Sequence, residues 1–266
     1  MTRAAATRRF RMLALASPLV VAAALTPVLS RAQPGDEPSD ELLSQGRELY
    51  LTGCVSCHGP DGGGEKGPDG KLRGPSLEDS GEAGAYYYLH TGRMPLGNSE
   101  EQPRRKEPAY DEDEIEALVA YVASLGDGPE LPAVDTSVGD LALGGDIYRE
   151  NCQACHSASA SGGALSYGRA APSLVPADPS EVGAAIRIGP NNMPVFGPDV
   201  ISRAELDDLA RYVEYLDDPA DPGGVPIGRV GPIPEGFVAW AVGMVALLVL
   251  TAWIGTRAAI RRRRAT

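Results

Sequence analysis

The 266-residue sequence has few aromatic residues, few histidines and only four cysteines. Three Phe and two Trp supply too little large side-chain volume for one big core of ordinary density, so a group other than side chains is expected to help fill the interior. A mean hydropathy of -0.16 excludes a multi-span membrane protein, while 43% apolar residues exclude a disordered chain. Most of the chain is therefore expected to fold in water.

Basic residues are scarce in the body of the chain. All 36 acidic residues lie from Asp36 to Glu235, together with 14 basic residues, so this window has a net charge of -22. Nucleic-acid binding requires clustered Lys and Arg, and we therefore expect no nucleic-acid partner. The acidic surface suits either solubility or the steering of a basic partner.

The N-terminus resembles an export signal. Arg8, Arg9 and Arg11 precede an apolar run over residues 12–29, and small residues follow at Ser30 and Ala32. This pattern predicts a signal peptide over residues 1–32. The alternative is an uncleaved N-terminal anchor, since the run has nearly the length needed to span a bilayer. Either interpretation places the following segment outside the cytoplasm.

The C-terminus carries an uncharged apolar run that predicts one transmembrane helix over residues 236–256. Trp240 and Trp253 lie near its two ends, as interfacial aromatic residues do. Five Arg follow in residues 257–266, so the positive-inside rule predicts a basic cytoplasmic tail. The sequence therefore indicates a single-pass protein of the cell membrane whose acidic body lies on the extracytoplasmic side.

The body contains an internal duplication. In each copy a Gly stands eight residues, and a Tyr four residues, before the first Cys of a Cys-x-x-Cys-His motif: Gly46 and Tyr50, then Gly144 and Tyr148. Each copy continues with Pro-Ser-Leu, a loop containing Met-Pro, and an acidic amphipathic stretch. The repeat is too long for a short-period solenoid, so it indicates two tandem domains.

The Cys-x-x-Cys-His motif is the attachment site of c-type haem, in which both thiols form thioethers and the His ligates the iron. A zinc tetrathiolate would leave both His without a role, and structural disulfides would not require the two-residue gap twice. We therefore predict two covalently bound haem c groups. The predicted attachment and proximal residues are Cys54, Cys57, His58, Cys152, Cys155 and His156.

Two methionines are candidates for the sixth iron ligands. Met94 and Met193 lie 36 and 37 residues after the motif His, and a Pro follows each. Thioether sulfur is a suitable haem ligand and raises the reduction potential. His90 is a competitor in the first domain. Its counterpart in the second copy is Arg187, which favours a helix-surface or propionate-side position for His90.

Each copy resembles a class I cytochrome c domain. This resemblance rests on the Gly-x-x-x-Tyr helix, the Cys-x-x-Cys-His motif, the Pro-bearing loop, the Met loop and the C-terminal helix. It implies that Tyr50 and Tyr148 lie where the terminal helices cross. It also implies that Pro75 and Pro172 offer backbone carbonyls to Nδ1 of the two proximal histidines.

The whole arrangement resembles the dihaem cytochrome c subunit of actinobacterial-type cytochrome bc complexes. The expected fold is mainly α, with class I cytochrome c domains at 40–126 and 137–217, a Pro/Gly-rich stalk at 218–235 and the C-terminal transmembrane helix. The resemblance implies an electron-transfer subunit of a quinol:cytochrome c oxidoreductase, with no substrate chemistry of its own. Its implied partners are a cytochrome b subunit, the Rieske iron–sulfur subunit and a terminal cytochrome c oxidase.

Three other functions remain open from the residues. One is the cytochrome subunit of a periplasmic dehydrogenase or an oxidase, another is a dihaem peroxidase, and the third is a redox sensor or assembly factor. A peroxidase needs an open sixth position, which the matched Met loops disfavour. Residues 98–110 form an insertion without a counterpart in the second copy. They suit either a docking loop or a solvated charged loop.

Overall fold

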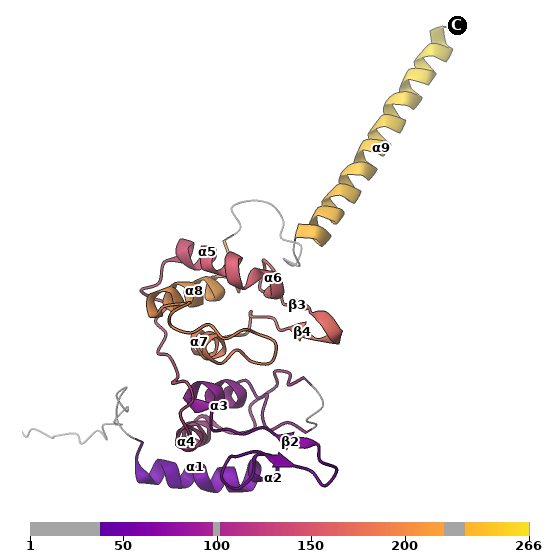
Figure 1. Cartoon of the computed structure of the whole chain (residues 1–266). Helices are drawn as coiled ribbons and strands as arrows, with labels where there is room; N and C mark the ends of the chain where they lie inside the picture. The colour runs from indigo at the N-terminus through magenta and orange to yellow at the C-terminus, as the bar shows by residue number, and fades with distance from the viewer. Residues whose placement is uncertain (1–37, 98–101, 221–231, 266) are drawn as a thin grey trace, which may run out of the picture. The chain divides into compact units, whose positions relative to one another are not determined.

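The computed structural model describes residues 38–97, 102–220 and 232–265. The predicted signal peptide lies outside the described residues, as do residues 98–101 of the insertion and most of the predicted stalk. The predicted mainly α fold is confirmed within these ranges (Figure 1).

The first domain consists of four helices and one short hairpin, in which β1 pairs antiparallel with β2. Its elements are α1 (Asp40–Gly53), α2 (Val55–His58), β1 (Glu65–Lys66), β2 (Leu72–Gly74), α3 (Gly81–His90) and α4 (Glu112–Ala123).

The second domain repeats this order, again with one antiparallel hairpin. Its elements are α5 (Leu141–Asn151), α6 (Gln153–His156), β3 (Gly163–Ala164), the 3₁₀ turn η1 (Ser166–Gly168), β4 (Ala170–Ala171), α7 (Pro179–Ile188) and α8 (Arg203–Tyr215).

A very close helix crossing closes each domain, α1 against α4 and α5 against α8 (Figure 1). A Cβ atom on Gly46 would lie 2.0 Å from the Ala117 carbonyl oxygen, and one on Gly144 would lie 2.0 Å from the Asp208 carbonyl oxygen. Only glycine therefore permits these backbones to approach so closely. The repeated Gly of the sequence is the residue on which both crossings depend.

Tyrosines pack beside both crossings, as the resemblance predicted. Tyr50 is fully buried with its ring centroid 5.2 Å from that of Tyr121. Tyr148 is fully buried 5.4 Å from the ring centroid of Tyr212.

Matched capping boxes start the last helix of each domain. The Asp111 side chain accepts from the Glu114 N–H while Glu114 accepts from the Asp111 N–H, and Ser202 and Glu205 repeat this exchange. Such reciprocal bonds satisfy backbone N–H groups that a helix start leaves without partners. They explain why α4 begins at Glu112 and α8 begins at Arg203.

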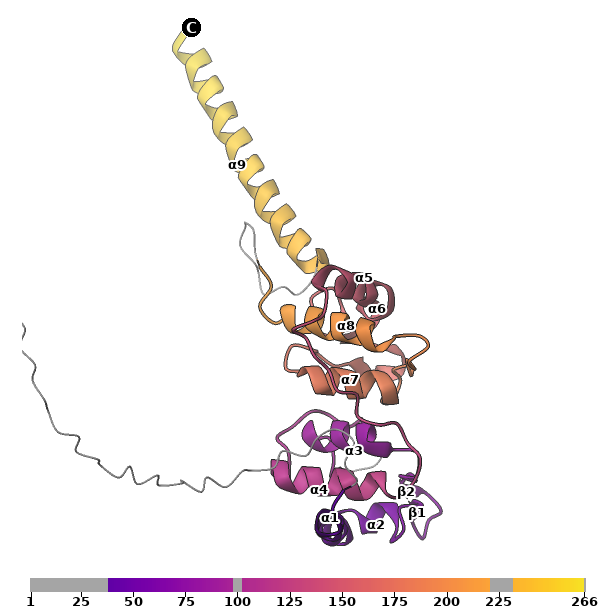
Figure 2. The ribbon, with the colours of Figure 1, turned by 90° about the vertical axis from the view of Figure 1, so that its left-hand side faces the viewer.

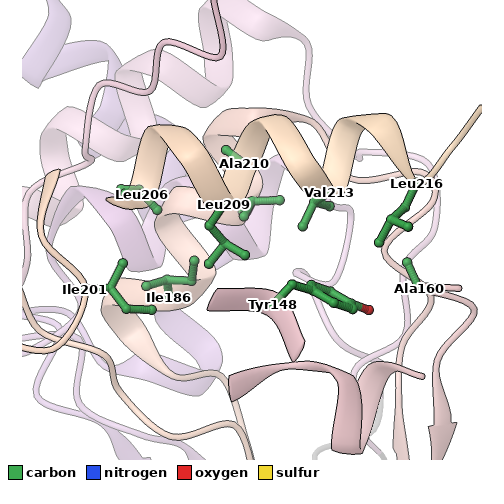
Figure 3. Close-up of a cluster of buried hydrophobic side chains, with 10 residues drawn as sticks. Tyr148, Ala160, Ile186, Ile201, Leu206, Leu209, Ala210, Val213 and Leu216 are labelled. Atoms are coloured by element: carbon green, nitrogen blue, oxygen red, sulfur yellow. The ribbon is translucent and has the colours of Figure 1, made fainter. Parts of the chain in front are cut away.

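The apolar core of the second domain gathers under α8. Figure 3 shows Leu209 and Val213 pointing from α8 toward Tyr148, with Ile186 and Ile201 beside them. The equivalent cluster of the first domain contains Tyr50, Leu118 and Val122.

The C-terminal helix α9 (Pro232–Ala265) is longer than the predicted span of 236–256. It begins at a proline, which is favourable in a first helical turn. It then continues through the Arg-rich tail, because Arg and Ala are good helix formers. Its residues Glu235–Arg261 are long and apolar enough to cross a membrane.

The two domains contact each other through α3 and α7 (Figure 2). Ala83 and Ala184 are fully buried in this contact, and Tyr87 is nearly so. The linker between the domains is hydrogen-bonded to both. The Pro129 carbonyl accepts from the Ala83 N–H at 3.1 Å, and the Asp135 N–H donates to Asp207 at 2.9 Å.

Replacing the crossing glycine tests its role in stability. We expect Gly46→Ala to lower the free energy of unfolding by about 1–3 kcal/mol, because the added methyl group forces α1 away from α4. Thermal and urea unfolding of the purified protein measure the change. Gly63→Ala is the matched control, since no atom lies within 4 Å of the Cβ it would add. Equal stability of the two variants would contradict the steric argument.

Candidate haem sites

Each Cys-x-x-Cys-His motif forms one helical turn directly after the first helix of its domain. The His58 N–H donates to the Cys54 carbonyl at 3.0 Å, and the His156 N–H donates to the Cys152 carbonyl at 2.9 Å. Residues at i, i+3 and i+4 of a helical turn share one face. The turn therefore places both cysteines and the histidine of each motif on the same side, and all four thiols are free of disulfides.

The ring orientation of both motif histidines is fixed by a proline carbonyl. His58 Nδ1 lies 2.8 Å from the Pro75 oxygen, and His156 Nδ1 lies 3.0 Å from the Pro172 oxygen. A carbonyl can only accept, so Nδ1 carries the proton in each ring. Nε2 is then left as the lone-pair nitrogen, which is the state needed to ligate a metal. The expectation drawn from the class I resemblance is confirmed here.

Burial favours the neutral form of the second of these histidines. It lowers the pKa of His156, although the hydrogen bond to Pro172 opposes this shift. Burial also raises the pKa of Cys54 and of Cys152 to about 11, with a smaller contribution from the second cysteine of each motif. Both effects follow from the cost of placing charge in an apolar interior.

The repeated tyrosine ties the first helix to the residue that follows each motif. Tyr50 Oη donates to the Gly59 carbonyl at 2.6 Å, and Tyr148 Oη donates to the Ser157 carbonyl at 2.7 Å. Gly59 and Ser157 both have positive φ, at 78° and 65°. The chain turns sharply at this point, and the tyrosine hydroxyl holds the turn.

A cavity of about 1100 Å³ adjoins the first motif. Its walls contain all four predicted site residues of the first domain, Cys54, Cys57, His58 and Met94. It exceeds the usual 300–1,000 Å³ of small-molecule pockets. Its size, the paired thiols, the free imidazole nitrogen and the thioether suit an iron porphyrin, which supplies the core volume that the few aromatic residues leave out.

The second-domain residues gather around the second core. Cys152 and Met193 both pack against the buried cluster that contains Tyr148, and His156 is 8% exposed. None of the four predicted second-site residues is among those lining the cavity described above. Instead, the start of the second Met loop, residues 189–191, forms part of that cavity's wall. The two Met loops therefore approach the same space.

His90 lies at the contact between the domains. Its Nδ1 is 3.1 Å from Glu181 Oε1 of the second domain, its ring stacks on Tyr86, and it is not among the residues lining the cavity. This position supports Met94 over His90 as the candidate ligand of the first site. It does not support the predicted position of His90 on the propionate side of a haem.

Two arginines near the Met loops make structural contacts that the sequence does not predict. Arg187 Nη1 donates to the carbonyls of Phe196 and Ile201, at 2.7 and 2.9 Å, and so fixes the chain that follows Met193. Arg93 precedes Met94, is 5% exposed and lies 4.7 Å above the Tyr87 ring. In the sequence, Arg187 stands out only because it is the counterpart of His90 in the second copy.

Comparison with known proteins agrees with this geometry. The family model for cytochrome c matches residues 43–126, and the model for cytochrome c oxidase, cbb3-type, subunit III matches residues 139–213. Fold and sites thus define a protein with tandem cytochrome c domains, which carry covalent haem c.

Similar curated proteins extend over nearly the whole chain. The cytochrome bc1 complex cytochrome c subunit of Mycobacterium tuberculosis (strain ATCC 25618 / H37Rv) is 42% identical, over 89% of this chain and 85% of that protein. The subunits of Mycobacterium leprae and Corynebacterium efficiens are 42% and 36% identical, each over 90% of this chain and 83% and 84% of those proteins. This chain belongs to the family of cytochrome bc1 complex cytochrome c subunits.

A partial likeness exists to one oxidase subunit. The cbb3-type cytochrome c oxidase subunit FixP of Bradyrhizobium sp. is 29% identical over 45% of this chain and 41% of that protein. A match of this extent reflects shared cytochrome c domains.

The buried tyrosine predicts a specific dependence of stability on pH. Burial raises the pKa of Tyr50 from 10.0 to about 12, so its contribution to stability is complete below pH 10 and is lost as the pH rises toward 12. At pH 8, Tyr50→Phe should cost about 1 kcal/mol through the lost hydrogen bond to Gly59. At pH 11 the difference from the parent protein should be smaller.

Urea unfolding, followed by far-UV circular dichroism, measures the free energy of unfolding of Tyr50→Phe and of the parent protein at pH 8 and at pH 11. Tyr167→Phe is the control, because Tyr167 is fully exposed. A Tyr50→Phe difference that does not change with pH would contradict this account.

Proposed function

We propose that this chain relays electrons within a quinol-oxidising cytochrome bc complex, from the Rieske iron–sulfur subunit to a terminal cytochrome c oxidase. The observation that carries the proposal is the duplicated site, in which both motif histidines have Nδ1 held by a proline carbonyl. Two equivalent sites on one chain suit a relay. Full-length similarity to cytochrome bc1 complex subunits supports the same role.

The proposal assigns a role to each site residue. Cys54, Cys57, Cys152 and Cys155 would attach two haem c groups through thioethers, and His58 with Met94 and His156 with Met193 would ligate the two irons. When bound, the haem iron supplies one-electron chemistry by changing its oxidation state. The proline carbonyls orient the imidazoles. The thioether sulfurs favour a high potential.

The same proposal places the chain in the membrane. Helix α9 anchors it, the haem domains lie on the extracytoplasmic side, and the Arg-rich end of the helix lies in the cytoplasm. The acidic body at 36–235 then faces redox partners outside the cell membrane. The cytochrome b subunit is the proposed membrane partner of the complex.

A cytochrome subunit of a cbb3-type oxidase is the second candidate function. The match of residues 139–213 to the cbb3-type subunit III model favours it. The similarity to bc1 complex subunits covers about twice as much of the chain, so we prefer the first candidate.

Replacing the candidate sulfur ligand tests the site assignment. We expect Met94→Ala to remove the far-red sulfur-to-iron absorption of one haem, about half of the total, while haem content stays constant. Optical spectra of the oxidised protein measure the band, and Met193→Ala should remove the other half. Met244→Leu, on α9 and far along the chain from either site, should leave the band unchanged. A full-strength band in both site variants would refute the assignment.

Gentle solubilisation of membranes tests the function itself. We expect the full-length chain to co-purify with a cytochrome b subunit, a Rieske protein and a copper-containing oxidase, and menaquinol to reduce its haems in that assembly. Co-purification with a periplasmic dehydrogenase, or isolation of the chain alone, would contradict the proposed relay.

A further inference from the structure

A buried carboxylate lies where the two domains meet. Glu181 is on the first turn of α7 in the second domain and is only 3% exposed. Its Oε2 contacts the guanidinium of Arg105, and its Oε1 lies 3.1 Å from His90 Nδ1. Both partners belong to the first domain, and Arg105 lies in the insertion.

A carboxylate this deeply buried is costly unless it is paired. Within its own domain Glu181 has no positively charged partner among the described residues, and its neighbour Asp178 is also acidic. Asp178 Oδ2 is 3.5 Å from His90 Nδ1, and the ring of His90 stacks on Tyr86. The compensating charge for Glu181 is therefore supplied by Arg105 of the other domain. The ligand atoms of His90, Asp178 and Glu181 lie close enough together to hold a metal ion, but the guanidinium of Arg105 already supplies a positive charge to Glu181.

The insertion makes a second contact with the second domain. The Gln102 side-chain amide donates to the Ala170 carbonyl at 2.9 Å and accepts from the Ala170 N–H at 3.3 Å. It thereby binds both backbone groups of one residue in β4. This pair of bonds is independent of the ionic contact at Glu181.

The insertion also holds the Met loop of its own domain. Lys106 Nζ donates to the Pro95 carbonyl at 2.7 Å, and the Lys106 N–H donates to the Thr91 carbonyl at 3.3 Å. These two carbonyls flank Met94 in the sequence. One short segment is therefore bonded to the first Met loop and to two elements of the second domain.

We propose that residues 102–106 of the insertion are an interdomain clamp, in which Arg105 and Gln102 bind Glu181 and Ala170 and so fix the two Met loops at one shared cavity. The proposal rests on the proposed function, since the purpose of the clamp is to hold two haem sites at a constant separation. Residues from both Met loops line the cavity, which includes Met94 and residues 189–191. Arg105, Gln102 and Glu181 act as positioning residues.

The clamp is tested on the full-length, haem-loaded protein with spin labels on the two domains. Labels are placed at Ser44→Cys on α1 and Ala142→Cys on α5, both exposed positions. Pulsed dipolar spectroscopy of the reduced protein then gives the distribution of label-to-label distances. We expect one narrow distribution in the parent protein and a broader one in Arg105→Gln and in Gln102→Ala.

The ionic pair predicts a specific order among variants. In Arg105→Gln the buried carboxylate of Glu181 loses its main cationic partner. When Arg105→Gln is combined with Glu181→Gln, both charges of the pair are removed, so the pair leaves no buried charge without a partner. The double variant should therefore have a narrower distribution than Arg105→Gln alone. Haem-to-haem electron transfer after flash reduction should slow severalfold in Arg105→Gln and partly recover in the double variant.

Arg104→Gln is the matched control, because it removes one positive charge from the neighbouring exposed position of the insertion. Its distance distribution should equal that of the parent protein. Narrow distributions in both Arg105→Gln and Gln102→Ala would overturn the proposal, as would equal broadening in Arg104→Gln. If Arg105→Gln does not fold, Gln102→Ala decides the question, because removing the neutral Gln102 side chain leaves no buried charge without a partner.

The clamp and the proposed function fail in different ways. Unchanged distances with normal haem spectra would reject the clamp alone. Reaction of the native cysteines with the spin label would show that their thiols are free. That result would reject the haem sites whatever the distances.

Discussion

The close crossing of the first and last helix in each domain is the contact on which the rest of the structure depends. Gly46 and Gly144 let the backbones meet, and the buried Tyr50 and Tyr148 pack beside them. Each tyrosine hydroxyl then holds the turn that follows the motif histidine. The crossing therefore sets the start of the Cys-x-x-Cys-His turn and, through it, the direction in which the imidazole faces. The duplication preserves this chain of contacts and varies much of what surrounds it.

The two Met loops are supported by different means. In the second domain Arg187 binds the carbonyls of Phe196 and Ile201, whereas in the first domain Lys106 of the insertion binds the Pro95 carbonyl. Duplicated domains are free to diverge in this way as long as each Met stays packed against the core of its own domain. The difference also gives the first domain a segment that reaches the second. An acidic body thus uses several of its few cations in contacts between its own segments, at Arg105, Lys106 and Arg187.

The repeated helices and the Cys-x-x-Cys-His turns lie where local spacing in the sequence predicted them. The proline carbonyls at Pro75 and Pro172 lie as the resemblance to class I cytochrome c domains implied. The structure also places Met94 beside His58 in one cavity. The role of Glu181 could not be predicted, since its burial depends on Arg105, 76 residues away. The insertion had no second copy for comparison, so its contacts with the second domain through Gln102 and Arg105 could not be predicted either.

We expect both duplicated motifs to carry covalently attached haem. Mass spectrometry of the intact protein under denaturing conditions checks this, because thioether-bound haem stays on the chain while loosely held groups are lost. The expected mass is that of the mature polypeptide plus two haem groups. A mass corresponding to one haem, or to the bare polypeptide, would contradict it.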